Sequence, residues 1–136
     1  MARTKRHQTP RRSARQIFQG LLRDHFWGMD IARSAWIAPS ALIDRTWPRG
    51  IHIGQDCIID EQAVVLTHDM TRGLYLDTVI GARTVIGVRA IILPGVTIGD
   101  DCTVEPGTLV TKDVPSGSRV QGNPARIVDQ AHSDAA

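Results

Sequence analysis

The sequence predicts a single all-β domain built as a β-helix, a coil whose flat sides are short strands. Residues 80–115 divide into six consecutive units of six residues: IGARTV, IGVRAI, ILPGVT, IGDDCT, VEPGTL and VTKDVP. Each unit begins with an aliphatic residue, and a small or β-branched residue follows four positions later. An α-helix needs apolar residues at three- and four-residue spacing, and an alternating strand needs a spacing of two. A period of six fits neither, and it indicates a β-helix.

The same period continues towards the N-terminus, with two interruptions. Ten residues separate Ile43 from Ile53, so that unit carries four extra, and fifteen separate Val65 from Ile80, so that unit carries nine extra. At three units per turn, both insertions leave from the same corner of the coil, and such loops commonly build a binding face. The sequence thus predicts about four coils, which begin near Ile31, Ile53, Ile80 and Ile98.

The N-terminus is expected to hold a basic tail and a short helix over residues 1–28. The first fifteen residues carry six basic side chains and no acidic one, whereas the remainder carries ten basic and fourteen acidic residues. Residues 1–12 are interpreted as a solubilising tail, with weak peripheral membrane contact as the alternative and no role in nucleic-acid binding. A helix from Ser13 to about Trp27 places its apolar face over the open first coil, with a membrane-surface helix as the alternative.

The C-terminal part is expected to depart from the repeat. The solenoid domain is assigned to residues 29–128, and residues 129–136 form a polar tail. After Pro115 no unit of six is recognisable, and Gly117, Gly122 and Pro124 indicate an extended segment that leaves the last coil.

Composition places the protein in the cytoplasm and argues against a metal site. Cys57 and Cys102 both fall at the small inward position of a repeat, where a free cysteine behaves as a small hydrophobe. A zinc site would need clustered ligands, so no metal is expected. The sequence shows no uninterrupted apolar stretch of the kind found in secretory signals or membrane spans.

His68 is the candidate catalytic residue. Only His52 and His68 lie within the coils, and His68 immediately precedes the second insertion. Its unperturbed pKa of about 6.5 suits a general base. The alternative is an ordinary surface histidine at a loop base. The neighbouring Asp69, or Glu61, is a candidate for orienting the ring, and a backbone carbonyl would serve equally well.

The stretch ILPGVTIGDDCTVEPGTLVTKDVPSGSRVQGNPARIV strongly resembles the hexapeptide-repeat acyltransferases, which include galactoside, maltose and serine acetyltransferases. With DRTWPRGIHIG and VLTHDMTRGLYLDTVIG, it looks most like the polysaccharide-assembly branch. This resemblance implies a left-handed parallel β-helix, a homotrimer with active sites between subunits, and acetyl-CoA as the acyl donor.

The resemblance also implies roles for individual residues. His68 matches the family's catalytic histidine, with Asp69 as its candidate partner. Thr111 and Lys112 match positions that contact CoA, and Arg126 matches a basic residue near the CoA phosphates, for which its charge and donors are suited. The pantetheine arm is expected to pass Gly87, Val88 and Pro106, and backbone amides near Gly87 are candidates for holding an oxyanion.

The function expected from these features is acetyl-CoA-dependent O-acetylation of a sugar or glycan hydroxyl in surface polysaccharide or lipopolysaccharide assembly. An amino-sugar N-acetyltransferase and a non-catalytic scaffold are the alternatives. A metal-dependent hydratase related to carbonic anhydrase is disfavoured because it needs three convergent histidines. One departure from the family is Val85, where many relatives have tryptophan, so that wall of the site is either missing or supplied elsewhere, with Trp47 and Tyr75 as the candidates.

Overall fold

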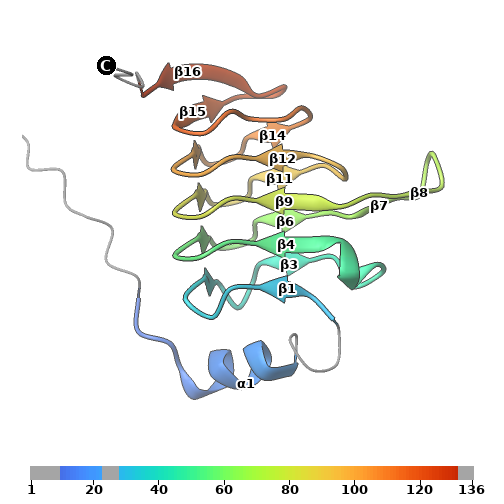
Figure 1. Cartoon of the computed structure of the whole chain (residues 1–136), viewed down its shortest axis with the longest axis vertical. Helices are drawn as coiled ribbons and strands as arrows, with labels where there is room; N and C mark the ends of the chain where they lie inside the picture. Colours follow the sequence, from blue (N-terminus) through green and yellow to red (C-terminus); the bar gives the residue numbers. More distant parts are fainter. Residues whose placement is uncertain (1–9, 23–27, 132–136) are drawn as a thin grey trace, which may run out of the picture.

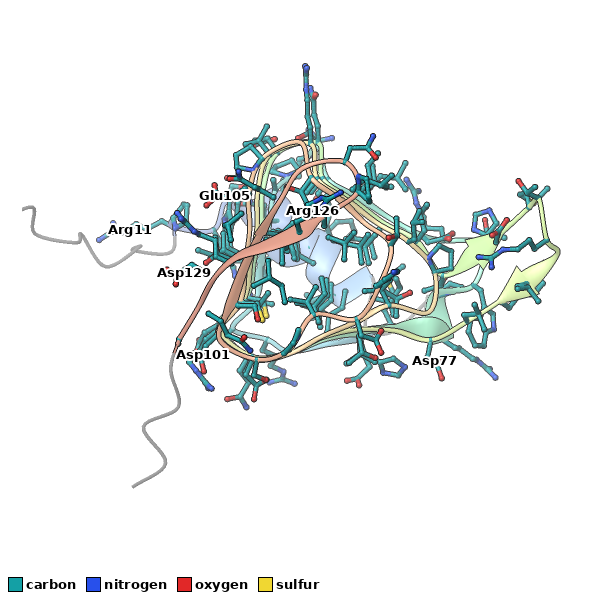
Figure 2. All side chains as sticks on the ribbon, turned by 90° about the horizontal axis from the view of Figure 1, so that it is seen from above. Arg11, Asp77, Asp101, Glu105, Arg126 and Asp129 are labelled. Atoms are coloured by element: carbon teal, nitrogen blue, oxygen red, sulfur yellow. The ribbon has the colours of Figure 1, made fainter. Side chains whose placement is uncertain are left out.

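A computed structural model describes residues 10–22 and 28–131 of the chain, and it confirms the β-helix. Three parallel sheets form the faces of a triangular prism (Figures 1 and 2). The fold is a left-handed parallel β-helix. Face A contains β1 (Asp30–Ile31), β4 (Ile51–Ile53), β9 (Thr78–Ile80) and β12 (Thr97–Ile98). Face C contains β3 (Leu42–Ile43), β6 (Val64–Val65), β11 (Ile91–Ile92) and β14 (Leu109–Val110).

Face B contains β2 (Trp36–Ile37), β5 (Ile58–Ile59), β10 (Val85–Ile86), β13 (Thr103–Val104), β15 (Ser118–Gln121) and β16 (Arg126–Gln130). Four complete coils are present, as predicted. The corners are named here by the faces they join, so that the chain passes the A–B, B–C and C–A corners in each coil.

The core follows the repeat directly. The leading aliphatic residues stack inside the prism, where Ile59, Ile86 and Val104 on face B are fully buried. The small residues turn inward at the corners, where less room is available. Cys57 and Cys102 are buried there as free thiols, in agreement with their prediction as core residues.

The C-terminal segment differs from its prediction, because the coil continues beyond Pro115. Val114 forms a parallel bridge to Ile98, and β15 pairs in parallel with β13 through Val120 and Val104. The step from Val110 to Val114 is four residues instead of six, and this shift in phase hides the partial fifth coil from the sequence. Only β16 then reverses direction, and it pairs with β15 in antiparallel fashion.

The N-terminal helix α1 (Ala14–Leu22) begins where it was expected. The Ser13 N–H donates to Gln16 Oε1 over 2.8 Å, and the Gln16 N–H donates to Ser13 Oγ over 3.3 Å, which forms a capping box. Residues 23–27, into which the helix was predicted to extend, lie outside the described residues. The helix lies across the end of the prism, and its apolar face meets the first coil only in part, because Ile17 and Leu21 line the cavity between them whereas Phe18 is 62% exposed.

No helix among the residues that the structure describes is both long and apolar enough to cross a membrane.

Candidate active site

Both insertions leave the prism at the C–A corner, as the spacing predicted. The first contains the 3₁₀ turn η2 (Pro48–Gly50), and the second is a hairpin of β7 (His68–Asp69) and β8 (Leu74–Tyr75) that projects from the prism (Figure 1). Trp47 and Tyr75 connect the two insertions by an edge-to-face contact, with ring centroids 6.1 Å apart and planes inclined by 69°. The two loops are therefore joined beside His68, which is the cross-strand partner of Tyr75.

Asp44 is the residue on which this corner is built. Asp44 is 2% exposed, and its carboxylate accepts the backbone N–H groups of Thr46 (2.8 Å), Thr67 (2.9 Å) and His68 (3.1 Å). Thr67 is fully buried, and its hydroxyl donates to the Trp47 carbonyl over 2.9 Å. Asp44 thus ties the start of the first insertion to the start of the second.

The same carboxylate contacts the imidazole. Oδ2 of Asp44 is hydrogen-bonded to Nδ1 of His68. Burial by itself raises the pKa of Asp44, but hydrogen bonds from Thr67, His68 and Thr46 outweigh it and lower the pKa to about 2. The carboxylate is therefore ionised at neutral pH, and it favours the tautomer with the proton on Nδ1. The lone pair of Nε2 is then available, and no described residue is hydrogen-bonded to Nε2.

The expected ring partners of His68 lie elsewhere. The Asp69 carboxylate accepts the backbone N–H groups of Thr71 and Arg72 and forms an ion pair with the Arg72 guanidinium at 2.6 Å. The side-chain hydrogen bond from Arg72 lowers the pKa of Asp69. Asp69 thus stabilises the tip of the hairpin. Glu61 lies at the B–C corner, where it accepts the Ser40 hydroxyl.

His52 is placed away from this site, on the outer side of face A. Its Nδ1 lies 3.0 Å from Asp30 and its Nε2 lies 3.5 Å from Asp77, whose position at the base of the hairpin is labelled in Figure 2. Hydrogen bonding to Asp30, and then to Asp77, raises the pKa of His52 despite its partial burial. In the part of the chain that the structure describes, no group of three or more His, Cys, Asp or Glu side chains could hold a metal ion.

The predicted CoA-contacting residues divide between two corners. Thr111 and Lys112 are exposed at the C–A corner, between β14 and Val114, and so share a corner with His68. Gly87, Val88 and Pro106 lie at the B–C corner in successive coils, and face C separates the two sets.

Arg126 lies above the B–C set. Its partner in β15 is Gln121, the last residue before that corner, and Figure 2 shows Arg126 over the end of the prism. The Arg126 side chain is exposed. Gly87 and Pro106 therefore stack along the B–C edge, and Arg126 lies over the end of the prism above them.

The Gly87 amide itself is already paired, so the predicted oxyanion donors are the other backbone amides near Gly87. The Gly87 N–H donates to the Val104 carbonyl over 2.8 Å within the sheet, so it is not available to an oxyanion. A Cβ atom at Gly87 would lie 2.7 Å from both the Pro106 nitrogen and the Val104 oxygen. Glycine is required there because adjacent coils approach closely.

Comparison with known proteins agrees with the hexapeptide-repeat fold. The family described as "Bacterial transferase hexapeptide (six repeats)" matches residues 77–112. The Bacillus subtilis (strain 168) protein named "Putative acetyltransferase YvoF" is 38% identical over 105 residues, which are 76% of this chain and 61% of that protein. The chain therefore spans less than two thirds of that relative's length.

Two solved structures share the fold. A galactoside acetyltransferase in complex with coenzyme A superposes with a TM-score of 0.64 at 24% identity, covering 91% of this chain and 74% of that one. The polySia-specific acetyltransferase NeuO superposes with a TM-score of 0.60 at 26% identity, covering 78% of this chain and 55% of that one.

Proposed function

The chain belongs to the hexapeptide-repeat transferase family, and on that premise we propose that it transfers an acetyl group from acetyl-CoA to a sugar hydroxyl. This proposal rests on the hydrogen-bonded pair of His68 and Asp44, which lies at the base of the two insertions that the Trp47–Tyr75 contact joins. The structural neighbours named above include one with bound coenzyme A, which supports the choice of donor. We assign the activity to the cytoplasm and to surface polysaccharide or lipopolysaccharide assembly.

In the proposed reaction, His68 acts as general base and then as general acid. Nε2 takes the proton of the acceptor hydroxyl while that oxygen attacks the thioester carbonyl. The tetrahedral intermediate then expels the CoA thiolate, which receives the proton from the imidazolium. Asp44 stabilises the imidazolium and holds the ring through Nδ1, as the carboxylate of a catalytic triad does.

Direct transfer is favoured over a covalent acyl-enzyme. The Cys57 and Cys102 side chains are buried, with Sγ atoms 2.8 Å from the Gly81 carbonyl and 3.2 Å from the Pro115 carbonyl. Burial raises the pKa of Cys57, which disfavours its nucleophilic thiolate form.

The acceptor is proposed to lie against β8. Tyr75 is 57% exposed and is the cross-strand partner of His68, so both side chains point to the same side of the hairpin. An exposed aromatic ring beside a base provides an apolar wall for a sugar ring, and the Trp47 contact holds it in place. This pair would substitute for the tryptophan that Val85 replaces.

A trimer would unite the two sets of CoA residues. Within one subunit, face C separates His68 and Lys112 from Gly87 and Pro106. Cyclic assembly would place the C–A corner of one subunit beside the B–C corner of the next. We therefore propose a homotrimer in which His68, Thr111 and Lys112 of one subunit face Gly87, Val88, Pro106 and Arg126 of its neighbour.

The test is release of free CoA from acetyl-CoA across a panel of sugars and amino sugars, with mass spectrometry of the products. The wild-type protein should acetylate a hydroxyl, and His68→Ala should lower kcat by roughly a thousandfold while acetyl-CoA binding measured by calorimetry persists. His52→Ala is the matched control and should retain activity. Acetylation of an amine only would favour the N-acetyltransferase, and absence of acetyl-CoA binding at millimolar concentration would favour the scaffold.

A further inference from the structure

Helix α1 is attached to the prism by its polar side. Gln16, Gln19 and Gly20 are the half-buried residues of the helix. Ile17, Phe18 and Leu21 are 53%, 62% and 54% exposed. At 100° per residue these three side chains share one arc of the helix with Ala14, opposite the glutamines. An amphipathic helix that turns its apolar arc to water presents a surface for a partner.

The contacts that hold α1 are themselves polar. The Arg12 guanidinium, directly before the helix, donates to the backbone carbonyls of Arg33 and Ala35 on the first coil. Between α1 and this coil lies a cavity of about 290 Å³, and Ile17 and Leu21 line it together with the glutamines. Ile17 and Leu21 therefore border the junction while remaining more than half exposed, and Phe18 is the apolar side chain of the arc that lies away from the cavity.

The start of α1 is basic. Arg11 and Arg15 are exposed at the start of α1. Along the sequence, the first fifteen residues contain six basic residues and no acidic one. Figure 1 shows α1 lying across the end of the prism, below β1 and opposite β16. A flat anionic surface with an apolar interior would meet the arginines and the apolar arc together.

We propose that α1 is a docking surface for an anionic lipid bilayer, with Phe18 inserted below the headgroups, the exposed parts of Ile17 and Leu21 at the headgroup level, and Arg11 and Arg15 at the phosphates. Nucleic acid would use the arginines but would leave the three apolar side chains in water. An anionic bilayer contacts both the arginines and the apolar side chains, as it does for interfacial helices. The proposal does not depend on the transferase activity.

The experiment is co-sedimentation of the full-length protein with large vesicles of phosphatidylcholine alone or mixed with phosphatidylglycerol. Wild-type protein should partition onto the mixed vesicles, and added salt should weaken the binding. Phe18→Ser should lower the partition coefficient about tenfold through lost apolar burial. The double change Arg11→Glu and Arg15→Glu should lower it by about tenfold or more through charge reversal.

Ile127→Ser is the matched control, because Ile127 is 50% exposed on β16 at the other end of the molecule, and it should leave partitioning unchanged. Circular dichroism of each variant checks that the fold is retained. Equal partitioning of wild type and Phe18→Ser would overturn the proposal. A second result would also overturn the proposal: wild type does not bind vesicles, and Phe18→Ser forms a smaller oligomer than wild type. The arc would then be a contact surface for a second copy of the chain. Salt-dependent binding of labelled RNA without vesicle binding would count against it as well.

Discussion

Asp44 is the residue whose importance the sequence concealed. It lies twenty-four positions before His68, one full coil earlier, and the intervening insertion removes any regular spacing between them. Asp69 was the natural candidate because it is adjacent in sequence, yet the tight hairpin directs its carboxylate to Arg72. The repeat itself carried a usable signal. Ile43 and Val65 are aligned in neighbouring coils, so Asp44 occupies the coil position that Leu66 occupies in the next coil. An acid at that position, just before the first insertion, faces the same corner.

Asp44→Asn is expected to lower kcat by roughly two to four orders of magnitude. An asparagine amide can donate to Nδ1, which would move the imidazole proton to Nε2 and remove the base. The Michaelis constant for acetyl-CoA should change little, because Asp44 contacts the ring and backbone only. Steady-state kinetics checks this result, and an equally reduced rate in Asp69→Asn would contradict the assignment.

The Asp44→Asn variant also tests the low pKa of the Asp44 carboxyl group. The folded-state pKa of Asp44 is about 2, below its ordinary value of 3.8, so the ionised carboxylate stabilises the fold above about pH 4. That stabilisation is lost as pH falls from about 4 to about 2. The difference in free energy of unfolding between wild type and Asp44→Asn should therefore shrink across this window, as measured by urea denaturation. A constant difference would show that Asp44 is not held as an anion.

At the scale of elements, the hexad period predicted each strand of the four coils because one inward aliphatic residue per face is a strict requirement of the prism. The same logic failed where the period itself changed, at the four-residue step from Val110 to Val114. For α1, an amphipathic pattern shows that an apolar arc exists but not how much of it meets the prism. Ile17 lines the cavity against the first coil, whereas Phe18 faces water.

Gly87 allows the close approach of two coils to be tested separately from cofactor binding. Gly87→Ala should destabilise the fold by about 2 kcal/mol, because the added Cβ would meet backbone atoms of Val104 and Pro106 that cannot rotate away. Gly20→Ala is the control, since no atom lies within 4 Å of the added Cβ in α1. It should stabilise the helix by about 1 kcal/mol or less. Chemical denaturation measures both, and an unchanged stability in Gly87→Ala would mean that the residue serves the ligand alone.

At the scale of the whole molecule, the prism distributes one proposed active site over two corners. Strand order alone places His68 and Lys112 at the C–A corner and Gly87 and Pro106 at the B–C corner. The sequence could predict this division once three units per coil were recognised. It could not predict how face C is covered, where Leu42 and Ile91 are 52% and 37% exposed. Those outward aliphatic residues are consistent with a neighbouring subunit along that face.

A complementation experiment tests whether one site takes residues from two subunits. His68→Ala lacks the base, and Arg126→Glu should raise the Michaelis constant for acetyl-CoA by repelling its phosphates. Each variant alone should be nearly inactive at low acetyl-CoA. The two proteins are denatured together in equal amounts and refolded, so that cyclic trimers form at random. A site is intact when the subunit that supplies His68 is the Arg126→Glu variant and its neighbour is the His68→Ala variant. About a quarter of the sites meet both conditions, so about a quarter of wild-type activity should return. Light scattering should give the mass of three chains.

Separately refolded variants mixed afterwards serve as the control, and they should stay inactive if subunit exchange is slow. If co-refolding restores no activity while the trimer forms, His68 and Arg126 must serve the same site within one subunit.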